Sequence, residues 1–223
     1  MEHLNIDGKT VQIFAAAKPH APLVILNTVH GEGEKVYRLV REETQIDFSM
    51  AVIGNIAWDD EMSPWAIPPI SKNDTPCTGG ADAYLEKLTT IILPEIMHRI
   101  PSEPNFAALA GYSLAGLFAV YAMYRTDVFS RIASASGSFW YPGILEYVRE
   151  HEPRRKPERI YFSLGDKESK TKNKILQSVE ENTRQLEKWY SASGVETVYE
   201  VNPGNHFREC DERMAKGICR ILR

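Results

Sequence analysis

The chain has 223 residues, a formal net charge of −4 and an isoelectric point near 5.9. Hydrophobic residues make up 43% of it and charged residues 25%, which excludes an intrinsically disordered or a fibrous protein. The length suits one domain, residues 1–223, with a substantial buried core. The net charge is negative and the sequence has no dense stripe of basic residues, so we expect no nucleic acid among its partners.

The three cysteines, Cys77, Cys210 and Cys219, form an odd count without the spacing of a metal site. We interpret them as reduced thiols of a cytoplasmic protein. The first residues have neither the basic nor the apolar region of a secretory signal, and no apolar run reaches membrane-spanning length. We therefore expect a cytoplasmic location, no membrane association, no bound metal and no cofactor.

The first half of the chain predicts a hairpin followed by alternating strands and helices. Strands over 4–6 and 11–16 flank the turn Asp7-Gly8-Lys9. The apolar run 23–27 is typical of a strand covered on both faces, an amphipathic helix follows through about Glu43, and 48–53 form the next buried strand. Residues 54–80 then form a long loop-like region, and its two tryptophans favour an ordered segment.

The second half continues the alternation. A helix is predicted over 81–99, and Pro94 is expected to end or kink it. The strand 106–110 runs into a helix to about Thr126, further strands follow at 132–135, 159–164 and 197–201, and helices are expected over 173–190 and at the end of the chain. This order predicts an α/β fold, with a mostly parallel central sheet, an N-terminal antiparallel hairpin and helices on both faces.

The stretch 106–119 has the pattern of a nucleophile elbow, in which a buried strand turns sharply into a helix with a serine at the apex. Gly111 and Ala115 flank Ser113 at two residues on either side, where close approach demands small residues. Ala115 stands where the usual pattern has a second glycine. A simpler interpretation is a strand-to-helix turn in which Ser113 is only the N-cap.

Two further polar groups follow later strands. Asp166 and Glu168 come after the strand 159–164, and His206 comes after the last strand. Carboxyl ends of parallel strands meet at one edge of a sheet, so these groups should lie near Ser113. Ser113 is then the nucleophile, His206 the base that takes its proton, and a carboxylate orients the imidazole.

The acid is either Glu168 or Asp166. The acid of such sites often follows a strand-ending glycine by three positions, which favours Glu168, whereas Asp166 lies close enough to the strand to cap the turn. The oxyanion of an acyl-transfer intermediate needs two backbone N–H donors. We assign them to Leu114 and to Glu32, with Gly31 as the alternative to Glu32.

Aromatic side chains are the candidates for substrate contacts. Trp58, Trp65 and Trp140 could line an acyl or alcohol pocket, with Trp58 and Trp140 as the favoured pair. Packing in the core or in a lid explains tryptophans at these positions equally well. His30 is interpreted as a structural residue that shapes the oxyanion loop.

At these residues the chain resembles the esterase D and enterochelin-esterase-like family of α/β-hydrolases. The segments that carry the resemblance are 30–33, 60–65, 78–85, 111–118, 134–140, 165–168 and His206. The resemblance is strongest to the bacterial siderophore-esterase-like branch and implies an α/β-hydrolase fold and a serine hydrolase acting on small-molecule esters. Residues 58–60 lack the arginine that we expect where siderophore esterases recognise an anionic ligand.

We therefore expect a serine esterase with the catalytic residues Ser113, His206 and Glu168. Two alternatives remain open. The same site could transfer the acyl group to an alcohol other than water, or the fold could be retained as a binding module without activity. Neither the ester nor the oligomeric state can be read from the sequence.

Overall fold

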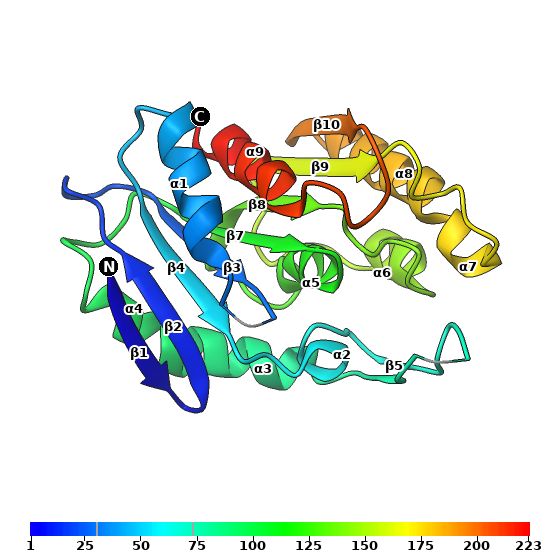
Figure 1. The fold of residues 1–223 in the computed structure, drawn as a ribbon, viewed down its shortest axis with the longest axis horizontal. Helices are drawn as coiled ribbons and strands as arrows, with labels where there is room; N and C mark the ends of the chain where they lie inside the picture. The colour runs from blue at the N-terminus through cyan, green and yellow to red at the C-terminus, as the bar shows by residue number, and fades with distance from the viewer. Residues whose placement is uncertain (30, 73) are drawn as a thin grey trace.

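The structure is a computed structural model that describes residues 1–29, 31–72 and 74–223. In these residues eight strands form one sheet, in the order β1-β2-β4-β3-β7-β8-β9-β10 (Figure 1). The strands of this sheet are β1 (Glu2–Ile6), β2 (Lys9–Phe14), β3 (Leu23–Asn27), β4 (Ser49–Gly54), β7 (Ala107–Tyr112), β8 (Phe129–Ala135), β9 (Arg159–Gly165) and β10 (Glu196–Asn202).

The expected mixture of pairings is confirmed. β1 and β2 pair antiparallel, as do β2 and β4, and the pairs from β4 through β3, β7, β8 and β9 to β10 are all parallel. The opening hairpin turns at Asp7 and Gly8, which have φ angles of 48° and 80°. Two successive positive φ angles are typical of the two-residue turn that matches the twist of a hairpin, and aspartate and glycine adopt them readily.

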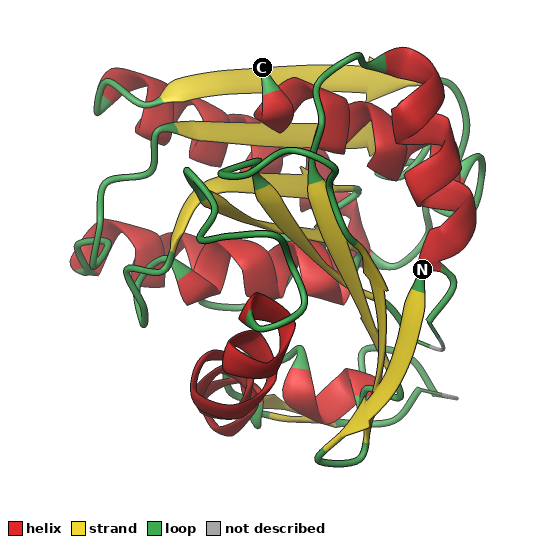
Figure 2. Ribbon diagram, turned by 90° about the vertical axis from the view of Figure 1, so that its left-hand side faces the viewer, coloured by secondary structure: helices red, strands yellow, loops and turns green. Residues whose placement is uncertain are grey.

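Helices cover both faces of the sheet, as Figure 2 shows, because the central strands are apolar on both sides. The helices α1 (Gly33–Glu43) and α9 (Cys210–Leu222) pack over one face. On the other face lie α3 (Ala81–Lys87), α5 (Leu114–Ala122), α6 (Ile144–Glu150) and α8 (Val179–Ala192). The edge formed by the carboxyl ends of the parallel strands stays open between these layers.

Several boundaries differ from the sequence-based expectation. The helix that begins at Ala81 does not end at Pro94; it passes through a π-helical stretch, η1 (Leu88–Ile92), into α4 (Leu93–Met97). The wider turn ahead of the proline accommodates its missing N–H and its ring. The predicted helix 173–190 is divided at Ser178 into α7 (Lys174–Gln177) and α8, and α6 was not predicted.

The long region 54–80 is ordered around short elements. It contains α2 (Trp58–Glu61) and a two-stranded ribbon of β5 (Ala66–Ile67) and β6 (Cys77–Thr78). Side-chain hydrogen bonds close it on itself, since the hydroxyls of Thr75 and Thr78 donate to the carboxylates of Asp59 and Asp60. The prediction of an ordered segment is confirmed for the residues that the structure describes.

Candidate active site

Ser113 lies at the sharp turn between β7 and α5. Its backbone has φ 57° and ψ −123°, a strained conformation for a residue with a side chain. The turn brings residues 111 and 115 into contact: a Cβ on Gly111 would lie 2.3 Å from the carbonyl oxygen of Ala115 and 2.7 Å from its Cβ. Glycine is therefore required at 111, and a residue no larger than alanine fits at 115.

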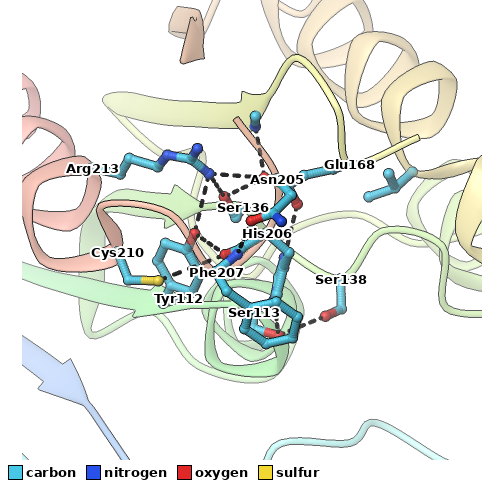
Figure 3. A network of polar contacts seen from close by, with 12 residues as sticks. Tyr112, Ser113, Ser136, Ser138, Glu168, Asn205, His206, Phe207, Cys210 and Arg213 are labelled. Carbon is cyan, nitrogen blue, oxygen red and sulfur yellow. Dashed lines mark hydrogen bonds and ion pairs between the residues drawn. The ribbon is translucent and has the colours of Figure 1, made fainter. Parts of the chain in front are cut away.

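A continuous line of hydrogen bonds joins Ser113, His206 and Glu168 (Figure 3). The Ser113 Oγ is 3.0 Å from Nε2 of His206, and Nδ1 of the same ring is 2.8 Å from Oε2 of Glu168. A carboxylate only accepts hydrogen bonds, so Nδ1 carries the proton and Nε2 is left to accept from the serine hydroxyl. The structure thus brings together three residues that follow β7, β9 and β10.

The side chain of Glu168 is only 4% exposed. Its Oε1 accepts hydrogen bonds from the Gly165 N–H at 2.6 Å and from the Ser136 hydroxyl at 2.7 Å. Burial alone would raise the pKa of this carboxyl, but the hydrogen bond and charge of His206, together with these two donors, lower the pKa below its ordinary value. Glu168 is therefore ionised at neutral pH.

Asp166, the alternative acid, occupies a different place. Its Oδ1 accepts a hydrogen bond of 2.7 Å from the Gly204 N–H, and its own N–H donates to the Asn202 carbonyl at 2.8 Å. These contacts tie the end of β9 to the loop after β10. Asp166 shapes the loop that carries His206, whereas the carboxylate against the imidazole belongs to Glu168.

The backbone of His206 is anchored from β7. The Tyr112 hydroxyl donates to the carbonyl of His206 at 2.6 Å, and the two rings lie 5.4 Å apart. Burial raises the pKa of Tyr112, so its hydroxyl stays protonated as a donor. The histidine is thus held at its ring by Glu168 and at its backbone by Tyr112.

Each of the two predicted oxyanion donors, Leu114 and Glu32, lines a cavity that Ser113 also lines. Leu114 is the first residue of α5, and Glu32 precedes α1 and lines the same cavity as Ser113. The Gly31 N–H donates to the Thr28 hydroxyl at 2.8 Å. The choice between Glu32 and Gly31 for the second donor stays a prediction. His30, interpreted from the sequence as a structural residue, lies outside the described residues.

Three cavities of about 410, 270 and 480 Å³ meet at Ser113, His206 and Phe207. Trp58 lines the first and third of them, and Trp140 lines the second and third. Trp65 packs instead, with its indole N–H donating to the Pro142 carbonyl and its ring against three tyrosines.

Several residues around the site were not predicted from the sequence. They are Tyr112, Ser136, Ser138, Phe207 and Arg213. The Oγ of Ser138 lies 3.3 Å from that of Ser113. Ser136 and Ser138 directly follow β8, so their place after a strand was a usable signal. Arg213 carried no such signal, because nothing in the sequence of α9 shows that its charge is buried.

None of the described residues form a group of three or more histidine, cysteine, aspartate or glutamate side chains that could hold a metal ion. No helix among them has the length and apolar character needed to cross a bilayer.

Comparisons with known proteins agree with this architecture. A protein of Bacillus subtilis (strain 168), "Uncharacterized protein YbbA", is 28% identical over 130 residues, which are 57% of this chain and 52% of that protein. The match thus spans about half the length of this curated relative.

Solved structures share the fold at low sequence identity. An IroE-like serine hydrolase from Shewanella oneidensis superposes with a TM-score of 0.81 at 16% identity, covering 95% of this chain and 75% of that one. The siderophore hydrolase EstB from Aspergillus nidulans gives a TM-score of 0.67 at 17% identity, covering 98% and 92%.

A protein family also matches most of the chain. The family described as "Putative esterase" matches residues 25–214, which include the elbow, the Glu168 turn and His206. The chain therefore belongs to this esterase family and has the α/β-hydrolase fold.

Proposed function

We propose that the protein is a serine esterase that hydrolyses a carboxylic ester through an acyl-enzyme on Ser113. The observation that carries this proposal is the line of hydrogen bonds from Ser113 Oγ through His206 to Glu168, at 3.0 Å and 2.8 Å. Membership of an esterase family supports the reaction class.

The first half-reaction acylates the serine. Ser113 Oγ attacks the ester carbonyl carbon while Nε2 of His206 takes the hydroxyl proton. The carbonyl oxygen becomes an oxyanion, which accepts hydrogen bonds from the backbone N–H groups of Leu114 and Glu32. As the intermediate collapses, the carbon–oxygen bond to the alcohol breaks and His206 returns its proton to the departing alkoxide oxygen.

The second half-reaction repeats these steps with water. His206 takes a proton from the water as its oxygen attacks the acyl carbon. The bond to Ser113 then breaks, and the proton goes back to the serine oxygen. Glu168 stays ionised throughout and stabilises the imidazolium that forms twice in each cycle.

The charges of the cavities disfavour an anionic ester. Among the described residues that line the three cavities there is no lysine or arginine. Besides His206, their ionisable side chains are tyrosine, cysteine and the carboxylates of Glu32, Asp59, Asp74, Glu168 and Asp211. An anionic substrate would find no lysine or arginine in this lining to balance its charge. We therefore expect that the substrate is not an anionic siderophore, although a structural neighbour is named a siderophore hydrolase.

A fluorophosphonate probe and a series of p-nitrophenyl esters test the proposal together. We expect the probe to label Ser113 and the esters to be hydrolysed. The Ser113→Ala variant should lose labelling and roughly 10⁴-fold or more of kcat. Intact folding of that variant is checked by its thermal unfolding. A folded wild-type protein that is neither labelled nor active on any ester would contradict the proposal.

A further inference from the structure

A buried arginine lies directly behind the proposed acid. Arg213 of α9 is only 2% exposed, and its Nη1 is 3.1 Å from Oε1 of Glu168. His206 contacts the other oxygen of the same carboxylate. The carboxylate is therefore held between a permanent cation on one side and the imidazole on the other (Figure 3).

Arg213 also reaches the loop that carries the histidine. Its Nη2 donates to the Pro203 carbonyl at 2.9 Å, and its Nη1 lies 3.3 Å from the hydroxyl of Tyr112, which itself donates to the His206 carbonyl. One guanidinium thus connects the acid, the tyrosine and the histidine loop.

The surrounding backbone leaves space for this side chain. A Cβ on Gly165 would lie 2.3 Å from the Gly204 carbonyl oxygen and 3.0 Å from both Nη1 and Nη2 of Arg213. The glycine at the end of β9 therefore makes room first for the loop after β10 and also for the guanidinium, and its N–H donates to Glu168.

We propose that Arg213 is a positioning residue of the esterase site, which holds Glu168 and the histidine loop in place and sets the pH range in which His206 can act as a base. This inference rests on the proposed function. With Arg213 present, the proton on His206 is taken up beside a carboxylate whose charge is already balanced. Without Arg213, the same proton is taken up beside an unbalanced anion, and protonation becomes easier.

Other titratable groups of the described residues lie near this pair. Tyr112 from β7 and Cys210 from α9 contact the His206 carbonyl, and Tyr199 from β10 interacts with Glu168. The carboxylates of Glu32, Asp59, Asp74 and Asp211 line cavities that His206 also lines. Burial raises the pKa of Tyr112, so it adds no charge near neutral pH. Of the described side chains, Arg213 is the permanent cation that forms an ion pair with Glu168, so its removal changes the charge directly beside that carboxylate.

The test is the pH profile of kcat/KM for three variants on an uncharged p-nitrophenyl ester. Arg213→Gln removes the charge but keeps an amide donor, and we expect the acid limb of its pH profile to move up by about one pH unit. Arg213→Lys keeps the charge but loses the paired N–H donors of the guanidinium. The acid limb of its pH profile should therefore stay at the wild-type pH while kcat falls several-fold. Tyr112→Phe loosens the histidine loop without changing charge, and its limb should also stay.

Each outcome decides between the roles. An unmoved limb in folded Arg213→Gln, or an equal shift in Tyr112→Phe, would overturn the inference, because arginine would then act through packing alone. Should Arg213→Gln fail to fold in thermal unfolding experiments, Arg213→Lys decides: a limb that moves by about half a unit or more contradicts the charge role, and a stationary limb supports it. An inactive, unlabelled wild-type protein would instead contradict the proposed function itself.

Discussion

The two sides of His206 have opposite character. On one side the Glu168 side chain is 4% exposed and its partner Arg213 is 2% exposed, and both are fixed by several hydrogen bonds. On the other side Phe207, the next residue in the chain, is 84% exposed and lines all three cavities. The imidazole itself, at 28% exposed, lies between these environments.

This difference separates two tasks. A buried network of charges and hydrogen bonds can hold a catalytic group to within a fraction of an ångström, because each missing partner is costly. An exposed aromatic ring has no buried polar partners to lose, so it can be substituted with little change in the free energy of unfolding. Changes on the acid side should therefore alter the chemical step and the stability, while changes on the entrance side should alter substrate choice.

The largest effect is expected on the acid side. Glu168→Gln removes the charge that stabilises the imidazolium, and we expect kcat to fall roughly 10²- to 10⁴-fold. The same change leaves the buried Arg213 without its counter-charge and should lower the free energy of unfolding by about 3–5 kcal/mol.

Asp166→Asn is the matched control, because the amide oxygen can still accept from the Gly204 N–H. Steady-state kinetics on one ester should show this variant within about threefold of the wild type. A fully active Glu168→Gln, or an Asp166→Asn that loses as much activity, would return the acid role to Asp166.

A smaller effect concerns acid stability. The pKa of Glu168 is lower in the folded protein than its ordinary value of 4.5, through the balance of burial and hydrogen bonds described above. A carboxyl with a lowered folded pKa contributes stability that is complete above the ordinary value and is lost as the pH falls through the folded pKa. The wild-type protein should therefore lose free energy of unfolding below about pH 4.5.

Urea unfolding from about pH 7 to about pH 3 measures this loss. Glu168→Gln should start lower at neutral pH and approach the wild-type curve in acid. Glu103→Gln, which changes an exposed carboxyl, should follow the wild-type curve throughout. Parallel curves for the wild type and Glu168→Gln would show that this carboxyl is not the source of the acid sensitivity.

The elbow and the sheet were predictable because their determinants are local. Gly111, Ser113 and Ala115 are two residues apart, and the strained turn that they form follows from that spacing alone. The alternation of apolar runs and helical patterns likewise gave the parallel sheet and the hairpin. The rule that such ends share one edge predicted that Ser113, Glu168 and His206 lie near one another, and their side chains are within hydrogen-bond distance in the structure.

The remainder depended on contacts between distant segments. The Trp65 indole N–H donates a hydrogen bond to a carbonyl 77 residues away in the chain. The Arg213 guanidinium forms hydrogen bonds with residues at the ends of β7, β9 and β10. No local pattern shows which polar group a buried charge will meet once the chain is folded. The path of 54–80 and the role of Arg213 were therefore outside the reach of sequence reasoning.

The smallest effect is expected at the entrance. Phe207 is exposed and its ring lies edge-on to His206, 5.2 Å away, so Phe207→Ala removes a cavity wall without removing a core contact. We expect KM for long acyl esters to rise about three- to tenfold, with kcat for acetyl esters and the free energy of unfolding nearly unchanged.

Trp189→Ala provides the comparison, because Trp189 is also an exposed aromatic residue but lines a groove between α6 and α8, away from Ser113. Its KM values should match the wild type for every chain length. Equal effects in both variants would mean that exposed aromatic rings act on this protein only through general surface properties. A Phe207→Ala variant that loses kcat on acetyl and long-chain esters alike would instead place Phe207 with the buried acid side, since its ring would then be needed to hold the imidazole of His206.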